Sequence, residues 1–171
     1  MDKNIIDKCL DFAEGNKGKF TILMAKKPGF PDTLIDGTEK QRLIKGYVKQ
    51  GIPTRQIADM LGCTQPNIVE HMRQYKKSVA FYGEWCEFWE FAADVRQTPV
   101  AIAFAGVLTG EEIADYIRRG IVTVGDFLTL SVTVRVEKLL KINGLDASKK
   151  AALFDCIRNL CYGTLGAEDL N

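Results

Sequence analysis

The chain has 171 residues, 46% of them hydrophobic and 26% charged, and its formal net charge is +1. This composition is typical of a globular protein with one medium or two small domains, and no apolar run approaches the roughly 18 residues of a membrane span. Five scattered cysteines without a Cys-x-x-Cys pair argue against a disulfide scaffold and favour reduced thiols in the cytoplasm.

The segment before residue 54 predicts two amphipathic helices, with an ambiguous short stretch and a turn-rich loop between them. Apolar residues at helical spacing in residues 4–14 predict an amphipathic first helix. Residues 20–25 suit either a strand or a short helix, and we favour the helix because no partner strand lies nearby. Thr38 and Gln41 have the spacing of a capping box, and the helix that they open is expected to end at Gly51.

Residues 54–73 predict two short helices joined by a tight turn. Thr54 is expected to cap the first helix and Thr64 the second, because their hydroxyls can accept unpaired N–H groups of the first turn. Gly62 is expected to end the first helix, since glycine enters the left-handed region without a Cβ penalty. The residues expected to pack between the two helices are Ile57, Ala58, Leu61, Ile68 and Met72.

This stretch resembles the helix-turn-helix family of DNA-binding proteins, with Ala58, Gly62, Ile68 and Met72 at the family's small, glycine and two apolar positions. The resemblance implies that the second helix lies in the major groove of DNA with its N-terminal residues at base edges. The alternative is a helical hairpin that only builds a small core. The residues implied to read bases are Gln65, Asn67, Glu70 and Arg73.

The positive charge of the chain is concentrated around this motif. Residues 38–77 hold eight basic and three acidic residues, for a net charge of +5, whereas residues 78–106 have a net charge of −3. A phosphate-facing surface requires such an excess, although a solvated helical face would also produce it. The candidates for phosphate contacts are Thr64, Lys45, Lys49, Arg55, Lys76 and Lys77.

Residues 78–106 predict an aromatic-rich linking helix followed by a connector. Residues 76–78 either interrupt the preceding helix or continue it into this one. The aromatic residues surround most of the helix, so it must be buried on two sides. It lies either in an intramolecular core or at an interface with a second copy of the chain, and its acidic edge argues against stacking on nucleic acid bases. The candidates for a dimer interface are Phe81, Trp85, Phe88 and Trp89.

The C-terminal part predicts further short helices. Thr109 and Glu112 have the spacing of a capping box, Gly120 is expected to end the helix that they open, and Thr123 is expected to cap the next one. The inner face of the first of these helices is expected to hold Ile113, Tyr116 and Ile117. A last helix is expected over residues 148–161.

Residues 120–131 and 139–145 resemble the C-terminal domain of bacterial RNA polymerase alpha subunits and, more broadly, helix-hairpin-helix domains. The resemblance implies a backbone phosphate cradle after Ile142, with Lys149 and Lys150 as candidates for a second DNA contact. Glu111 and Asp146 stand where these families have a DNA-contacting arginine and a glycine. We therefore favour a protein-interaction or dimerisation module over a second DNA contact or an inert structural role.

The sequence as a whole predicts an all-α protein with three parts. These are an N-terminal helix-turn-helix domain (1–77), an aromatic linking helix and connector (78–106), and a helix-hairpin-helix-like domain (107–171). Only one histidine is present, and no phosphate loop, nucleophile–base pair or metal-ligand cluster is visible, so we expect neither an enzyme nor a cofactor.

The expected function is sequence-specific binding of double-stranded DNA by a bacterial or phage transcriptional regulator. The protein is expected to act as a homodimer on a two-fold site, in the cytoplasm and with the nucleoid, without a membrane partner. The rival expectation is a structural or adaptor protein that uses the helical hairpins to bind other proteins, for instance in a phage particle or a polymerase complex.

Overall fold

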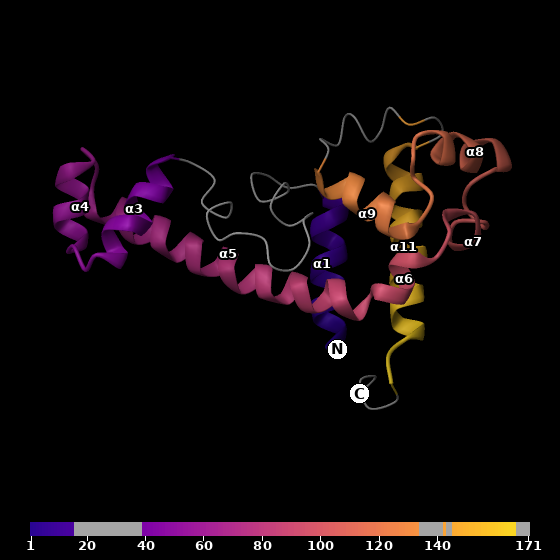
Figure 1. Ribbon diagram of the computed structural model, residues 1–171, viewed down its shortest axis with the longest axis horizontal. Helices are drawn as coiled ribbons and strands as arrows, with labels where there is room; N and C mark the ends of the chain where they lie inside the picture. Colours follow the sequence, from indigo (N-terminus) through magenta and orange to yellow (C-terminus); the bar gives the residue numbers. More distant parts are fainter. Residues whose placement is uncertain (16–38, 134–141, 143–144, 167–171) are drawn as a thin grey trace. The chain divides into compact units, whose positions relative to one another are not determined.

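The computed structural model describes residues 1–15, 39–133, 142 and 145–166, and in these residues every extended regular element is a helix (Figure 1). The fold is therefore all-α, as predicted. One isolated antiparallel bridge joins Pro99 to Thr123. The expectations for residues 20–25, for the capping box that begins at Thr38 and for most of the hairpin at 139–145 lie outside the described residues. No helix in the described part is long and apolar enough to cross a membrane.

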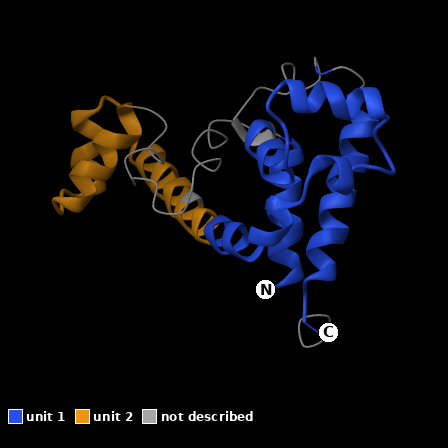
Figure 2. Ribbon diagram, turned by 45° about the vertical axis from the view of Figure 1, so that its right-hand side comes forward, with its two compact units in different colours: residues 1–28, 84–171 blue, residues 29–83 orange. Residues whose placement is uncertain are grey.

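The chain divides into two compact units, drawn in different colours in Figure 2. Unit 2 comprises residues 29–83 and contains α3 (Glu39–Lys49), α4 (Thr54–Met60) and the first part of α5 (Gln65–Phe91). Unit 1 comprises residues 1–28 and 84–171, so α1 belongs with the C-terminal part and not with the predicted N-terminal domain. Its helices are α1 (Lys3–Gly15), the end of α5, α6 (Ala93–Gln97), α7 (Val100–Ala103), α8 (Gly110–Arg118), α9 (Val124–Thr133) and α11 (Ala147–Gly163).

The sequence left open whether residues 76–78 interrupt a helix or continue it, and the structure shows one continuous helix, α5. It runs for 27 residues without a break at Lys76 and Lys77. The predicted boundary at residue 77 therefore falls inside a helix. This follows from the sequence between residues 65 and 91, which contains one glycine and only a first-turn proline, so nothing in its interior removes a helical hydrogen bond.

The core of unit 2 lies between α3, α4 and α5, and the predicted apolar pattern is confirmed there. Ile57 and Ile68 have no exposed surface, and Ala58 is only 3% exposed. Partly buried side chains surround this centre, including Leu61 and Met72 as predicted. Gly62 follows α4 with a φ of 61°, in the left-handed region that the prediction required.

The N-terminus of α4 differs from the prediction. Thr54 is the first helical residue and not the cap; Pro53 occupies the cap position, and no side chain caps the helix. Proline has no N–H and a fixed φ, so it enters a helix start without losing a hydrogen bond. The Thr54 hydroxyl instead accepts a hydrogen bond from the Gln65 side chain of α5.

The aromatic end of α5 is buried inside unit 1. Trp85 and Phe88 have no exposed surface and Trp89 is 7% exposed. The Trp85 ring lies 6.2 Å from the Phe12 ring of α1 and 5.7 Å from the Phe88 ring, measured between centroids. These three residues therefore form an intramolecular core, and the alternative that they form a dimer interface is wrong; Phe81 is half-buried.

A second aromatic cluster in unit 1 is centred on Phe127 of α9. Its ring centroid lies 5.3 Å from that of Phe104, 5.5 Å from that of Phe154 and 6.3 Å from that of Tyr116. Aromatic contacts at these distances add to the free energy gained by burying aromatic surface. Phe127 thus holds together the connector after α7 and helices α8, α9 and α11.

Charged groups fasten α1 to α11, which lie side by side in unit 1 (Figure 1). Arg158 Nε donates to Asp7 Oδ1 at 3.0 Å, and Arg158 Nη2 donates to Asp11 Oδ1 at 2.8 Å. The buried Lys150 ammonium donates to the Glu14 backbone carbonyl. These contacts explain why α1, although first in sequence, belongs to the C-terminal unit.

The predicted helix ends in the C-terminal part are mostly confirmed. The Thr109 hydroxyl accepts from the Glu112 N–H, and the Glu112 carboxylate accepts from the Thr109 N–H, which is a complete capping box. Thr123 likewise caps α9 by accepting from an N–H of its first turn, at 3.2 Å. Gly120 has a φ of 81° after α8. Ile117 is 46% exposed and is wrong as an inner residue, whereas Tyr116 is fully buried.

Candidate nucleic-acid interface

The start of α5 is fixed by the turn that precedes it. The Cys63 N–H donates to the Ala58 carbonyl at 2.9 Å, which closes the end of α4. The Thr64 carbonyl then accepts from the N–H groups of Asn67, at 3.0 Å, and Ile68, at 3.3 Å. Thr64 therefore stands at the N-cap position, and the side chains that follow have defined directions.

Two of the predicted base readers, Gln65 and Asn67, are exposed in this first turn. The Gln65 side-chain amide donates to the Thr54 hydroxyl at 2.9 Å, which ties the beginning of α5 to the beginning of α4. The Gln65 side chain is therefore held in one direction. The first turn of α5 presents two amide side chains to solvent while Ile68, next to them in sequence, is completely buried.

The other two predicted readers, Glu70 and Arg73, are bound to each other. Arg73 donates from Nε and from Nη2 to the two carboxylate oxygens of Glu70, at 2.7 and 2.5 Å. Gln74 Nε2 donates to Glu70 Oε1 at 2.9 Å. The hydrogen bonds from Arg73 and Gln74 lower the pKa of Glu70 to about 2, so the carboxylate is charged at physiological pH.

The structure adds Val69 to the outward side of this helix, a residue that the sequence did not single out. Its side chain is 52% exposed, although valine is usually buried. It lies one turn after Gln65 and one turn before Arg73, so the three side chains share a face of α5. The sequence contained a signal for the exposure of Val69, because Val69 does not share the face of α5 on which Ile68 and Met72 lie.

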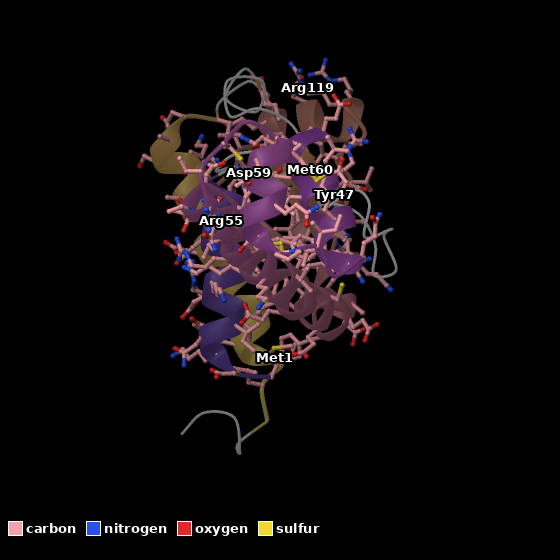
Figure 3. The ribbon with its side chains drawn as sticks, turned by 90° about the vertical axis from the view of Figure 1, so that its left-hand side faces the viewer. Met1, Tyr47, Arg55, Asp59, Met60 and Arg119 are labelled. Carbon is pink, nitrogen blue, oxygen red and sulfur yellow. The ribbon has the colours of Figure 1, made fainter. Side chains whose placement is uncertain are left out.

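Exposed basic side chains occur on all three helices of unit 2. Four of the residues predicted to contact phosphates are exposed: Lys49 at the end of α3, Arg55 in the first turn of α4, and Lys76 and Lys77 in α5. Figure 3 shows Arg55 on α4, with Asp59 and Met60 further along the same helix. The exposed bases come from all three helices that build the core of this unit.

Lys45 is a correction to the predicted phosphate contacts. Its residue surface is only 8% exposed, and its ammonium lies 4.7 Å from the centroid of the Tyr75 ring. A lysine in this position covers apolar surface with its stem and interacts with the ring face. Lys45 therefore helps to pack α3 against α5 and does not present its charge to a phosphate.

The predicted second DNA contact in unit 1 is also corrected. Lys149 Nζ donates to Glu112 Oε1 at 2.6 Å, and this hydrogen bond is the main cause of the lowered pKa of Glu112. Lys150 is only 5% exposed, and its ammonium donates to the Glu14 carbonyl. Asp146 caps α11 by accepting from the Lys149 N–H at 2.7 Å. Both lysines are therefore internal ties of unit 1.

The described residues contain no group of three or more histidine, cysteine or acidic side chains that could hold a metal ion. Burial raises the pKa values of the Cys9 and Cys161 thiols to about 12, so both are protonated and unreactive at neutral pH. Among the described residues, the first turns of α5 carry exposed polar side chains, and the helices of the same unit carry exposed bases.

Compared with known proteins, the chain matches no family model, no curated protein and no solved structure.

Proposed function

We propose that the chain binds double-stranded DNA in a sequence-specific manner and acts as a transcriptional regulator of bacterial or phage type. The observation that carries the proposal is the orientation of the first turns of α5. Their apolar side is anchored through Ile68, which has no exposed surface, and the amide side chains of Gln65 and Asn67 are exposed. A helix held in this way can enter a major groove with its N-terminal side chains at base edges.

Each exposed residue has a role that its chemistry supports. The side-chain amides of Gln65 and Asn67 can pair bidentately with adenine, and Arg73 can donate two hydrogen bonds to guanine. Val69 can contact the methyl group of thymine. Phosphates of the DNA backbone would be contacted by Lys49, Arg55, Lys76 and Lys77, with the turn residue Thr64 as a further donor.

A single reading helix covers only a few base pairs, so we propose that two copies of the chain act on a two-fold site. Exposed apolar residues in the described part of unit 1 are available for contacts between the two copies: Ile102 is 70%, Val122 48% and Ile117 46% exposed. The hydrogen bond from the Val100 N–H to the Val122 carbonyl, 3.0 Å long, brings the segments that carry Val122 and Ile102 together.

These exposed apolar residues also favour the second candidate function, an adaptor that binds other proteins and not DNA. An electrophoretic shift with sheared genomic DNA, repeated at a low and a moderate salt concentration, separates the two candidates. DNA binding predicts a shift at low salt that weakens steeply as salt rises, because phosphate contacts release counterions. An adaptor predicts no shift at either concentration.

A further inference from the structure

The geometry of Glu70 and Arg73 restricts what each can do at a DNA surface. Oε1 of Glu70 accepts from Arg73 Nη2 and from Gln74 Nε2, and Oε2 accepts from Arg73 Nε. An ionised carboxylate offers about four acceptor sites, and three of them are occupied here. Glu70 was implied to read a base, and a carboxylate would do so by accepting from the amino group of a cytosine, but it has little acceptor capacity left for that role.

Arg73 is in the opposite situation. A guanidinium has five N–H groups, and Glu70 uses the Nε–H and one of the two on Nη2. The N–H groups at the far end of the guanidinium, on Nη1 and Nη2, still form a fork. Such a fork is the group that pairs with O6 and N7 of guanine. The Arg73 side chain is 54% exposed, so this end is accessible.

We propose that Glu70 is a positioning residue, which holds the Arg73 guanidinium so that its free end reads a guanine in the major groove. This inference rests on the proposed DNA binding and assigns one base to the site. The ion pair also lowers the net positive charge that Arg73 would bring to any phosphate. Glu70 therefore raises discrimination between sequences in two ways: it orients the fork, and it reduces non-specific attraction.

The ion pair between Glu70 and Arg73 contributes little to the stability of the fold. Both side chains are about half exposed, and an exposed pair three residues apart on a helix contributes little to folding. Substitution of Glu70 should therefore leave the protein folded. This makes the positioning role testable, because a change in base preference would not be a consequence of unfolding.

The test is selection of bound sites from a random pool of duplex DNA, carried out with the full chain and with four variants. Glu70→Ala removes both the charge and the acceptors, whereas Glu70→Gln removes the charge but keeps one acceptor oxygen at the same reach. Arg73→Lys keeps the charge but has no fork. Asp59→Asn is the control, because it removes an exposed negative charge from the same unit, on α4 (Figure 3).

The expected result is that the unmodified chain selects a site with a guanine at one position. Glu70→Ala and Arg73→Lys should relax that same position about tenfold or more, Glu70→Gln should relax it less, and Asp59→Asn should leave it unchanged. Glu70→Ala should also bind random DNA more tightly, with a steeper dependence on salt. Circular dichroism should show that all variants unfold at the same temperature as the unmodified chain.

Two results would overturn the inference while leaving DNA binding intact. In the first, Glu70→Ala selects the same site with the same preference for guanine. In the second, Glu70→Ala relaxes a cytosine position that Arg73→Lys does not affect, which would show that Glu70 reads a base itself. Failure of the unmodified chain to select any site would instead overturn the proposed function, and the inference with it.

Discussion

Asn67 is the residue that tests base reading with the least disturbance to the fold, because its side chain is exposed. Asn67→Ala should lose sequence discrimination and keep weak, salt-dependent binding, since the phosphate contacts remain. The measurement is competition between the selected site and random duplex, for which the ratio of affinities should fall by about 5-fold to 100-fold. Equal ratios for the variant and the unmodified chain would contradict the role of Asn67.

Val69 provides a second test, because its exposed side chain shares a face of α5 with Gln65 and Arg73 and is proposed to contact the methyl group of a thymine. Val69→Ser should weaken the preference for thymine at one position of the site, through loss of a methyl contact. Val79→Ser is the matched control: Val79 is 39% exposed on the same helix and lies beyond the reading turns. If both variants or neither changed the preference, Val69 would not contact a base.

At the scale of elements, the turn between α4 and α5 depends on Gly62, whose φ is 61°. Space is available for a Cβ there, so the cost of Gly62→Ala is the backbone conformation itself, about 1–2 kcal/mol of unfolding free energy. Gly83 also has room for a Cβ, but it lies inside α5.

Gly83→Ala should therefore stabilise the protein by about 0.5–1 kcal/mol, because alanine is the better helix former. Urea unfolding of the two variants gives both values. We predict that the unfolding free energy falls for Gly62→Ala and rises for Gly83→Ala. Two changes of the same sign would show that the turn does not depend on a glycine in the left-handed conformation.

The sequence predicted the positions of the helices better than it predicted which helices pack against one another. The apolar spacing around Ile57 and Ile68 fixed the core of unit 2, and the Thr109–Glu112 capping box needed only local spacing. The place of α1 was missed, because its contacts with α5 and α11 join residues more than seventy positions apart. The positions of basic residues also led to two wrong predictions. Lys45 and Lys150 were predicted to contact DNA, but both are buried, and the sequence alone does not show burial.

For the candidate site, the sequence predicted the exposed amides but not the pairing of Glu70 with Arg73. Their spacing of three residues allows an ion pair on a helix. The same spacing allows both side chains to face DNA, so spacing alone left both readings open. Only the positions of the atoms show which N–H groups remain free.

On the scale of the whole molecule, the uneven distribution of charge gives a prediction about salt. Replacing Lys49 and Arg55 by alanine should flatten the dependence of log affinity on log salt by about one for each lost phosphate contact. Arg118 and Arg119 are exposed in unit 1, so their double alanine variant is the control with the same loss of charge. Equal flattening in both variants would mean that net charge alone, and not unit 2, governs binding.

Mapping the DNA-contacting surface on the full chain shows directly whether the first turns of α5 bind DNA. At 19.1 kDa the chain suits amide chemical-shift mapping by nuclear magnetic resonance during titration with a short duplex at low salt. If the first turns of α5 bind DNA, the shifted amides should lie mainly at residues 64–77, at the end of α3 and at the start of α4. Shifts confined to unit 1, or no shifts with duplex in excess, would contradict this binding.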